Sequence, residues 1–140
     1  DADIEIVLLG ALLHDIALIK KVGKRNNHHI NGAKIAEEIL NKYNYPQEKI
    51  NRVKNCVLHH RTSFDAENKE EVCVSDADIL SHFDNIPMIF DYAYKNYDVN
   101  LSNIRSFIKR YFENDYNDLS DKTKIIFKEE YENIMNVLFK

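Results

Sequence analysis

The sequence predicts an all-α protein, and three observations carry that prediction. Apolar residues recur three and four positions apart along much of the chain. Three glycines and two prolines are few for a chain of 140 residues. Alternating β-branched residues, which are typical of strands, are hard to find. The length is that of one domain, so we expect a single helical bundle of about six to seven helices over residues 1–140.

The first predicted helix covers about residues 3–22 and contains the longest apolar run, IVLLGALLHDIALI, at residues 6–19. Apolar residues lie on every side of this run, so a helix here is expected to be buried. A polar loop, GKRNNHH, follows it. The second helix is expected over about residues 31–43, where Ile35 and Ile39 share one face.

The remaining helices are predicted from residues that start or stop helices. Asn44 and Pro46 end the second helix, and Pro46 suits the first turn of a third helix that ends near His60. After the polar stretch RTSFDAEN, a fourth helix is expected over about residues 69–85. Three later helices are expected to begin at a proline or at a serine N-cap: Pro87, Ser102 and Ser120.

The composition excludes several classes of protein. A net charge of −4 argues against a nucleic-acid backbone as the main partner. Cys56 and Cys73 are too few for a disulfide framework, so a reducing cytoplasm is the expected compartment. The apolar run is too short, and too polar in its middle, to span a membrane, and we see no signal peptide. The composition leaves open whether the protein forms a homodimer.

The pair His14 and Asp15 is the most informative feature of the chain. These are the only ionisable side chains between Ile6 and Ile19. An unpaired carboxylate in apolar surroundings costs several kcal/mol, roughly. A divalent metal ion would compensate this cost, because His and Asp are both metal ligands. A packed histidine beside an aspartate that pairs with Lys or Arg is the alternative.

Further histidines and aspartates lie at the ends of the next helices or inside them. His28 and His29 stand at the start of the second helix, and His59 and His60 at the end of the third. In the fourth helix Asp78 has apolar neighbours and is the better ligand candidate, whereas Asp76 lies nearer polar residues and is expected to cap or pair. Each of these histidines, taken alone, is also compatible with a surface or loop-end position.

Four motifs in this order resemble the HD-domain superfamily of metal-dependent phosphohydrolases, in particular its small stand-alone members: ALLHDIA, HHINGAKIAEEIL, VLHHR and SDADIL. The resemblance covers about residues 3–85 and implies a metal-site core at 1–85 followed by C-terminal helices at 86–140. It implies that His14 and Asp15 form the dyad and that Asp78 is the late aspartate ligand. It also implies that His28 and His60 bind a second metal or the substrate phosphate.

The chain departs from the family pattern in two places. The family has a metal-binding histidine upstream of the dyad, but none of the thirteen residues before His14 is a histidine. The chain begins at Asp1, and we expect either that this ligand lies in a preceding segment or that the site has one ligand fewer. Ala17 and Leu18 stand where many members have Gly-Lys, which argues against the cyclic-dinucleotide phosphodiesterases of the family.

The predicted function is hydrolysis of a small phosphorylated molecule, such as a nucleotide, with one or two divalent ions per chain. Such ions lower the pKa of water and polarise phosphoryl oxygens. Mixed His and carboxylate ligands favour Mn, Fe, Co, Ni or Zn, with Mg as a further option. Asp15 would hold an ion and orient or deprotonate the water, and His28 and His60 would hold a second ion or protonate the leaving oxygen.

Two alternatives stand beside this prediction. The first is a catalytically silent HD domain that binds a nucleotide or a protein, which the missing upstream histidine favours. The second is another kind of metal protein. A di-iron bundle is excluded because no Glu is followed by His at the third position, and a zincin because HExxH is absent.

A basic segment lies between the dyad and His28, and contains Lys20, Lys21, Lys24 and Arg25. At the rim of a metal site these side chains would attract a phosphorylated substrate. A solvated loop in a lysine-rich protein is the alternative.

Overall fold

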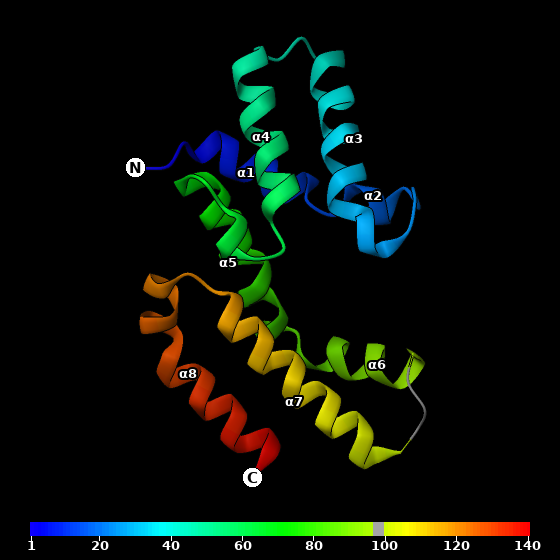
Figure 1. The fold of residues 1–140 in the computed structure, drawn as a ribbon, viewed down its shortest axis with the longest axis vertical. Coiled ribbons are helices and arrows are strands. Elements are labelled where there is room, and N and C mark those ends of the chain that lie inside the picture. Colours follow the sequence, from blue (N-terminus) through cyan, green and yellow to red (C-terminus); the bar gives the residue numbers. More distant parts are fainter. Residues whose placement is uncertain (97–99) are drawn as a thin grey trace. The chain divides into compact units, whose positions relative to one another are not determined.

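The computed structural model describes residues 1–96 and 100–140, and for Leu101 and Ser102 it describes the backbone alone. Within these residues the fold has no strand (Figure 1), and the prediction of an all-α fold is confirmed. Two short 3-10 turns, η1 (Arg25–Asn27) and η2 (Ser63–Asp65), precede α3 and α5. The described residues form eight α-helices: α1 (Ile4–Leu13), α2 (Ile16–Ile19), α3 (His28–Lys42), α4 (Gln47–His59), α5 (Lys69–Asp84), α6 (Ile86–Asn96), α7 (Leu101–Asp118) and α8 (Asp121–Phe139).

The expectation of one continuous helix over residues 3–22 is wrong. Helix α1 ends at Leu13, and the short α2 begins at Ile16. Asp15 has φ −103° and ψ 15°, outside the helical region, and its carbonyl accepts from the amides of Leu18 and Ile19. The dyad therefore lies in a break between two helices, which frees its side chains from the 100° spacing of adjacent helical residues.

Burial of the first helix was also overestimated. Leu8 and Leu12 of α1 are 56% and 73% exposed, and in α1 only Ile6 and Gly10 are buried. Periodicity cannot choose a buried face when every face is apolar, so the remaining fold makes that choice. The side chains of His14 and Asp15 are 26% and 40% exposed, so the dyad is partly open to solvent and not enclosed.

The other helix boundaries agree with the sequence to within a few residues. Helix α3 begins at His28, three residues earlier than expected, and so includes both histidines of the HHINGA motif. Pro87 lies in the first turn of α6, and Ser120 caps α8 by accepting from the amide of Thr123. Helix α7 begins at Leu101, which places Ser102 within its first turn; the side chain of Ser102 lies outside the described residues.

The structure forms two compact units, Asp1–Asp78 and Ile79–Lys140, and α5 contributes residues to both. The predicted arrangement, one domain over 1–140 with a metal-site core at 1–85 and C-terminal helices at 86–140, stays a prediction. No helix among the described residues is both long and apolar enough to cross a membrane.

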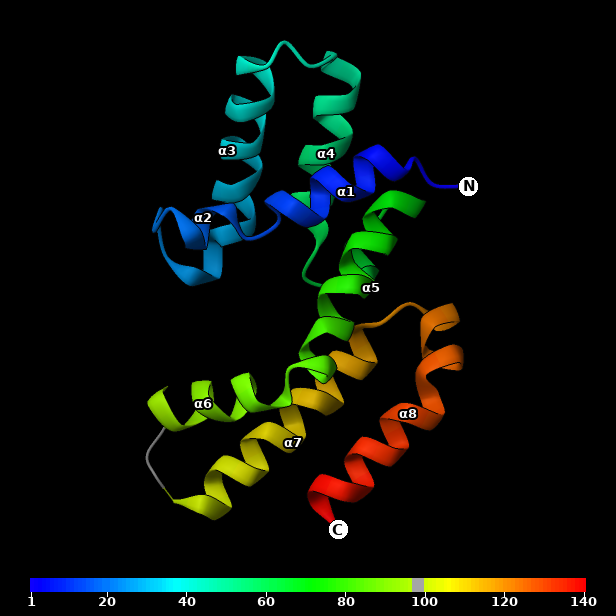
Figure 2. The same cartoon turned by 180° about the vertical axis from the view of Figure 1, so that it is seen from behind.

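In the first unit, α3 and α4 lie side by side and α1 packs against α4 (Figures 1 and 2). Two glycines permit close approach of these helices. A Cβ on Gly10 would lie 2.7 Å from Cβ of Cys56, and a Cβ on Gly32 would lie 3.1 Å from Val57 and 3.3 Å from the carbonyl oxygen of His14. Gly32 therefore brings the start of α3 close to the dyad. The apolar core of this unit comprises Ile6, Leu40, Ile50, Val53, Cys56 and Val74.

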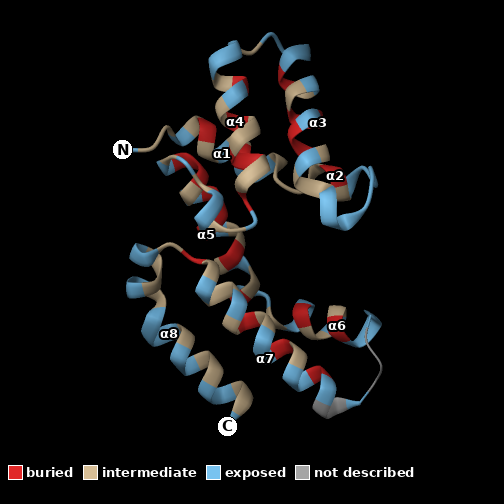
Figure 3. Cartoon of the chain, viewed as in Figure 1, coloured by how far each residue is buried: buried red, intermediate tan, exposed pale blue. Residues whose placement is uncertain are grey.

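The second unit is built around one apolar cluster: Ile79, Phe83, Ile89, Ala93, Ile104, Ile108, Phe112 and Leu119. The Phe83 ring stacks on Phe112 with centroids 4.9 Å apart. Figure 3 shows that α8 has no buried residue, so this helix covers the cluster with partly exposed side chains. His82 of α5 contacts Asp115 of α7 at 2.9 Å and ties these two helices together.

Candidate metal centre

Three histidines of the first unit are held in the same way. Nδ1 of His14 donates to the carbonyl of Ala11 at 2.7 Å, Nδ1 of His28 to Arg25 at 2.6 Å, and Nδ1 of His60 to Val57 at 2.7 Å. In each case the acceptor lies three residues earlier, at the end of a helix or 3-10 turn. A carbonyl oxygen only accepts, so Nδ1 carries the proton and the neutral ring presents the lone pair of Nε2.

The Nε2 atoms of His28 and His60 face each other at 3.0 Å. Two lone pairs at this separation repel unless a proton or a cation lies at the site. His60 is 1% exposed, and burial lowers its pKa below the ordinary range for histidine. A proton is therefore costly for His60, and a metal ion is the better partner for this pair.

Asp15 supplies the negative charge beside this pair. Its Oδ1 lies 3.2 Å from Nε2 of His28 and 3.9 Å from Nε2 of His60. This oxygen is buried and has no hydrogen-bond partner among residues 1–96 and 100–140. One ligand atom from each of the three residues lies within 4.8 Å of the others. A buried carboxylate oxygen without a donor is costly, so this donor set fits a divalent cation.

His14 and Asp78 extend the same cluster. Nε2 of His14 lies 3.3 Å from Oδ1 of Asp78 and 3.8 Å from Oδ2 of Asp15. Burial lowers the pKa of His14, but the hydrogen bonds to Asp78 and to the carbonyl of Ala11, with the charges of Asp78 and Asp15, raise it overall to about 9. The His14 and His60 rings are 5.2 Å apart, so one cluster contains both pairs.

The fold thus brings together all five residues singled out in the sequence. They come from the break between α1 and α2, the first residue of α3, the residue after α4, and α5. Each of these elements supplies only a terminus or a single turn to the site. In the order just given, the residues are His14 and Asp15, His28, His60, and Asp78. The group divides into two sets that share Asp15, one with His28 and His60 and the other with His14 and Asp78.

Asp76 and His59 do not join this cluster. Asp76 is buried within α5, which is compatible with the expectation that it caps or pairs. His59 contacts Oε2 of Glu71 through Nδ1 at 2.8 Å. His82, the remaining histidine outside the first unit, contacts Asp115 within the second unit.

Glu71 is a residue that the sequence analysis missed. Its carboxylate is completely buried, and it accepts from the amide of Glu67 at 2.8 Å and from Nδ2 of Asn68 at 2.5 Å. The amide of Glu71 donates to Oδ1 of Asn68. These reciprocal bonds form a variant of the capping box at the start of α5, in which Glu71 accepts from the side chain of Asn68 and the amide of Glu67. The pattern Asn-x-x-Glu at residues 68–71 was the signal for it.

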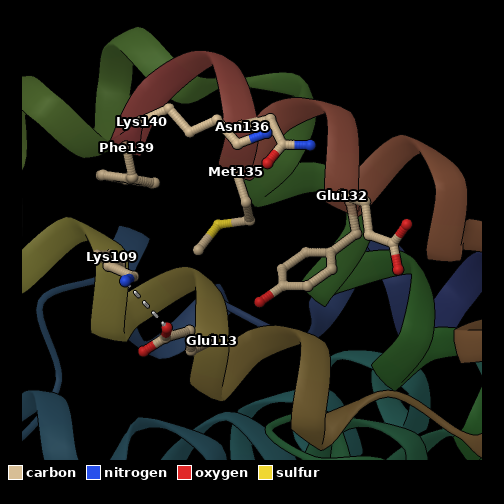
Figure 4. A pocket seen from close by; sticks show the side chains of 8 residues that line it. Lys109, Glu113, Glu132, Met135, Asn136, Phe139 and Lys140 are labelled. Carbon is tan, nitrogen blue, oxygen red and sulfur yellow. Dashed lines mark ion pairs between the residues drawn. The ribbon is translucent and has the colours of Figure 1, made fainter.

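The second unit has a separate pocket of about 420 Å³ between α7 and α8, which Figure 4 shows. None of the five clustered residues lines it. Its wall combines apolar side chains with both signs of charge: Lys109, Glu113, Tyr131, Glu132, Met135, Asn136, Phe139 and Lys140.

Comparison with known proteins identifies the family. A Clostridium beijerinckii protein described as uncharacterized is 37% identical over 57 residues, which are 41% of this chain and 36% of the relative. The match thus spans about a third of that relative's length. No solved structure matches the chain significantly. The HD domain matches residues 1–82, more than half of the chain and all five clustered residues, and the chain therefore belongs to the HD-domain family.

Proposed function

We propose that this protein is a metal-dependent phosphohydrolase that acts on a small phosphorylated molecule such as a nucleotide. HD domains are generally metal-dependent hydrolases, which supports the class of reaction. The observation that carries the proposal is the convergence of the Nε2 atoms of His28 and His60 on the unpartnered Oδ1 of Asp15.

The five clustered residues are the proposed ligands. Asp15, His28 and His60 form one set, and Asp15, His14 and Asp78 form the other, so one or two ions per chain are expected. Imidazole and carboxylate ligands together suit Mn, Fe, Co, Ni or Zn, with Mg as a further option. When bound, a divalent ion lowers the pKa of water and offsets the negative charge of phosphoryl oxygens.

The residues of the chain contribute to hydrolysis in two ways. Water adds to phosphorus and loses a proton, and the bond from phosphorus to the leaving oxygen breaks as that oxygen gains a proton. Asp15, which is 40% exposed, is open enough to orient the water or accept its proton. His28 and His60 face Asp15 and would hold a second ion, or His28, which is less buried than His60, would donate the proton that the leaving oxygen needs.

Elemental analysis by plasma mass spectrometry, together with a panel of phosphate esters and nucleotides, tests the proposal. We expect one or two transition-metal ions per chain and metal-dependent release of phosphate, with both lost in Asp15→Ala. A stoichiometric metal without turnover of any substrate would favour the alternative, a silent HD domain that binds a nucleotide or protein. Full metal content in Asp15→Ala would contradict the proposed site.

A further inference from the structure

Positive charge is concentrated in one segment beside the candidate metal centre. Residues 16–36 contain five cations and no acidic residue, although the chain as a whole has a net charge of −4. Four of these cations lie in the loop between α2 and α3, which we call the basic loop: Lys20, Lys21, Lys24 and Arg25. Asp15 directly precedes α2 and His28 directly follows η1, so proposed ligands flank this loop on both sides.

The lysines of the basic loop form no ion pair with any described residue. Elsewhere in the first unit Lys49 pairs with Glu5 and Lys54 with Glu37, the latter at 2.6 Å. Within the described part of the chain no carboxylate lies in ion-pair distance of Lys20, Lys21 or Lys24, and all three side chains are exposed. Adjacent like charges repel, and a bound anion would remove this repulsion.

The backbone of the basic loop has a defined conformation. Lys21 has φ 56° and Gly23 has φ 76°, and this left-handed region is unfavourable for a lysine because its Cβ crowds the backbone. The amide of Val22 donates to the carbonyl of Ala17 at 2.9 Å, and the side chain of Asn31 packs against Gly23. The loop is therefore held against α3 and does not simply extend into solvent.

The basic loop is joined directly to the candidate metal centre. The carbonyl of Arg25 is the acceptor that orients His28, at 2.6 Å from its Nδ1. On the other side Arg61 directly follows His60 at the end of α4, and its side chain is exposed. Basic residues therefore adjoin both members of the His28–His60 pair along the chain, in the loop before His28 and at Arg61 after His60.

We propose that the basic loop and Arg61 bind phosphate groups of the substrate that are not themselves hydrolysed. The inference rests on the proposed function, because it assumes that the metal centre holds the reacting phosphate. A monophosphate would leave most of the lysines of the basic loop without a partner, whereas each additional phosphate in a chain brings more negative charge to them. The preferred substrate class is therefore a molecule with two or more consecutive phosphates, such as a nucleoside diphosphate, a nucleoside triphosphate or a longer polyphosphate.

Calorimetric titration of the metal-loaded protein with inorganic tripolyphosphate and with inorganic phosphate tests the inference. The loop variant is Lys20→Gln/Lys21→Gln/Lys24→Gln. The matched control, Lys34→Gln/Lys42→Gln/Lys122→Gln, removes the same charge at exposed lysines for which no ion pair is seen among the described residues. We expect the loop variant to bind tripolyphosphate about tenfold more weakly or worse, with a much smaller effect on phosphate, and the control to bind nearly as the wild type.

Turnover separates this inference from the proposed function. A lower preference of the loop variant for a nucleoside triphosphate over a monophosphate ester, through KM and not kcat, supports both. Tripolyphosphate binding that depends on the loop, without hydrolysis of any substrate, supports the site and contradicts the enzyme. Hydrolysis with unchanged tripolyphosphate affinity in the loop variant, or an equal loss in the control, overturns the inference alone. Loop-dependent binding of a single-stranded oligonucleotide without binding of tripolyphosphate also overturns it.

Discussion

The orientation of each clustered histidine is set by a hydrogen bond to the carbonyl three residues before it. His14, His28 and His60 all follow this rule, and each lies where a helix or 3-10 turn begins or ends. A carbonyl oxygen has two lone pairs, so it can accept from Nδ1 even where it also accepts from a backbone amide, as Arg25 does from the amide of His28. Whenever a ring is neutral, this hydrogen bond selects the tautomer in which Nε2 can bind a metal.

Metal binding at the cluster is expected to release a proton at neutral pH. The pKa of His14 is raised to about 9, so its ring carries a proton in the metal-free protein at pH 7. Binding through Nε2 removes that proton, and the apparent affinity is expected to rise up to tenfold per pH unit until about pH 9. Calorimetry in buffers of different ionisation enthalpy measures the release, and its absence at pH 7 would exclude His14 as a ligand.

The same pKa shift affects the metal-free fold in a defined direction. Because the pKa of His14 is higher in the folded state, the ion pair with Asp78 stabilises the fold fully below the ordinary value of 6.5. That contribution is lost as the pH rises through about 9. Bound metal reverses this dependence of stability on pH, because metal binding requires the neutral His14 ring.

The two aspartates of SDADIL provide a matched pair of variants. Asp78 lies 3.3 Å from Nε2 of His14, whereas Asp76 is buried in the same helix. We expect Asp78→Ala to lose metal and Asp76→Ala to retain most of it, as measured by plasma mass spectrometry. His14→Ala is likewise expected to lose metal while keeping a helical circular dichroism spectrum. Loss in Asp76→Ala with retention in Asp78→Ala would mean that the other aspartate is the ligand.

At the scale of elements, two features position the side chains of the candidate metal centre. They are the break between α1 and α2 and the capping box of α5. The break lets His14 and Asp15 point into one cluster. The capping box joins the end of α4, through His59, to the start of α5, which carries Asp78. The spacing between His60 and Asp78 thus depends on a buried carboxylate outside the cluster.

Removal of that carboxylate is expected to destabilise the first unit. Glu71→Ala leaves His59, the amide of Glu67 and Nδ2 of Asn68 without their acceptor, and we expect a loss of about 2–3 kcal/mol in the free energy of unfolding. Urea denaturation measures it. Glu67→Ala is the control, because its side chain is exposed, and should stay within about 0.5 kcal/mol. Equal stability of the two variants would show that Glu71 has no such role.

At the scale of the whole molecule, all five proposed ligands belong to the first unit, and the HD domain match ends shortly after it. The second unit has its own apolar cluster and its own pocket, and none of the five proposed ligands belongs to it. A ligand that binds only the folded state raises stability by mass action.

Metal removal is therefore expected to lower the thermal stability of the protein. At a free metal concentration of one hundred times Kd the stabilisation is about 2.7 kcal/mol, which corresponds to roughly 5–10 °C in Tm for a chain of this length. Scanning calorimetry with and without a chelator measures the shift. Asp15→Ala should show no response to either metal or chelator, and an equal response in this variant would place the metal elsewhere.

The sequence by itself determined the helical class, most helix starts and the identity of the five clustered residues. These features depend on short-range physics: apolar spacing, proline and serine at helix starts, and a resemblance carried by four local motifs. Ser120 and Pro87 show this most clearly, because a cap or a first-turn proline needs only its immediate neighbours.

Only the tertiary structure decided the break after Leu13, the exposure of Leu8 and Leu12, and the burial of Glu71. It also brought His28, His60 and Asp15 together, through the close packing that Gly10 and Gly32 allow. These features depend on contacts between residues far apart in the chain. An apolar helix with no polar face acquires a buried side only when other helices pack against it. In the same way, the glutamate of an Asn-x-x-Glu pattern becomes buried only when other helices cover it.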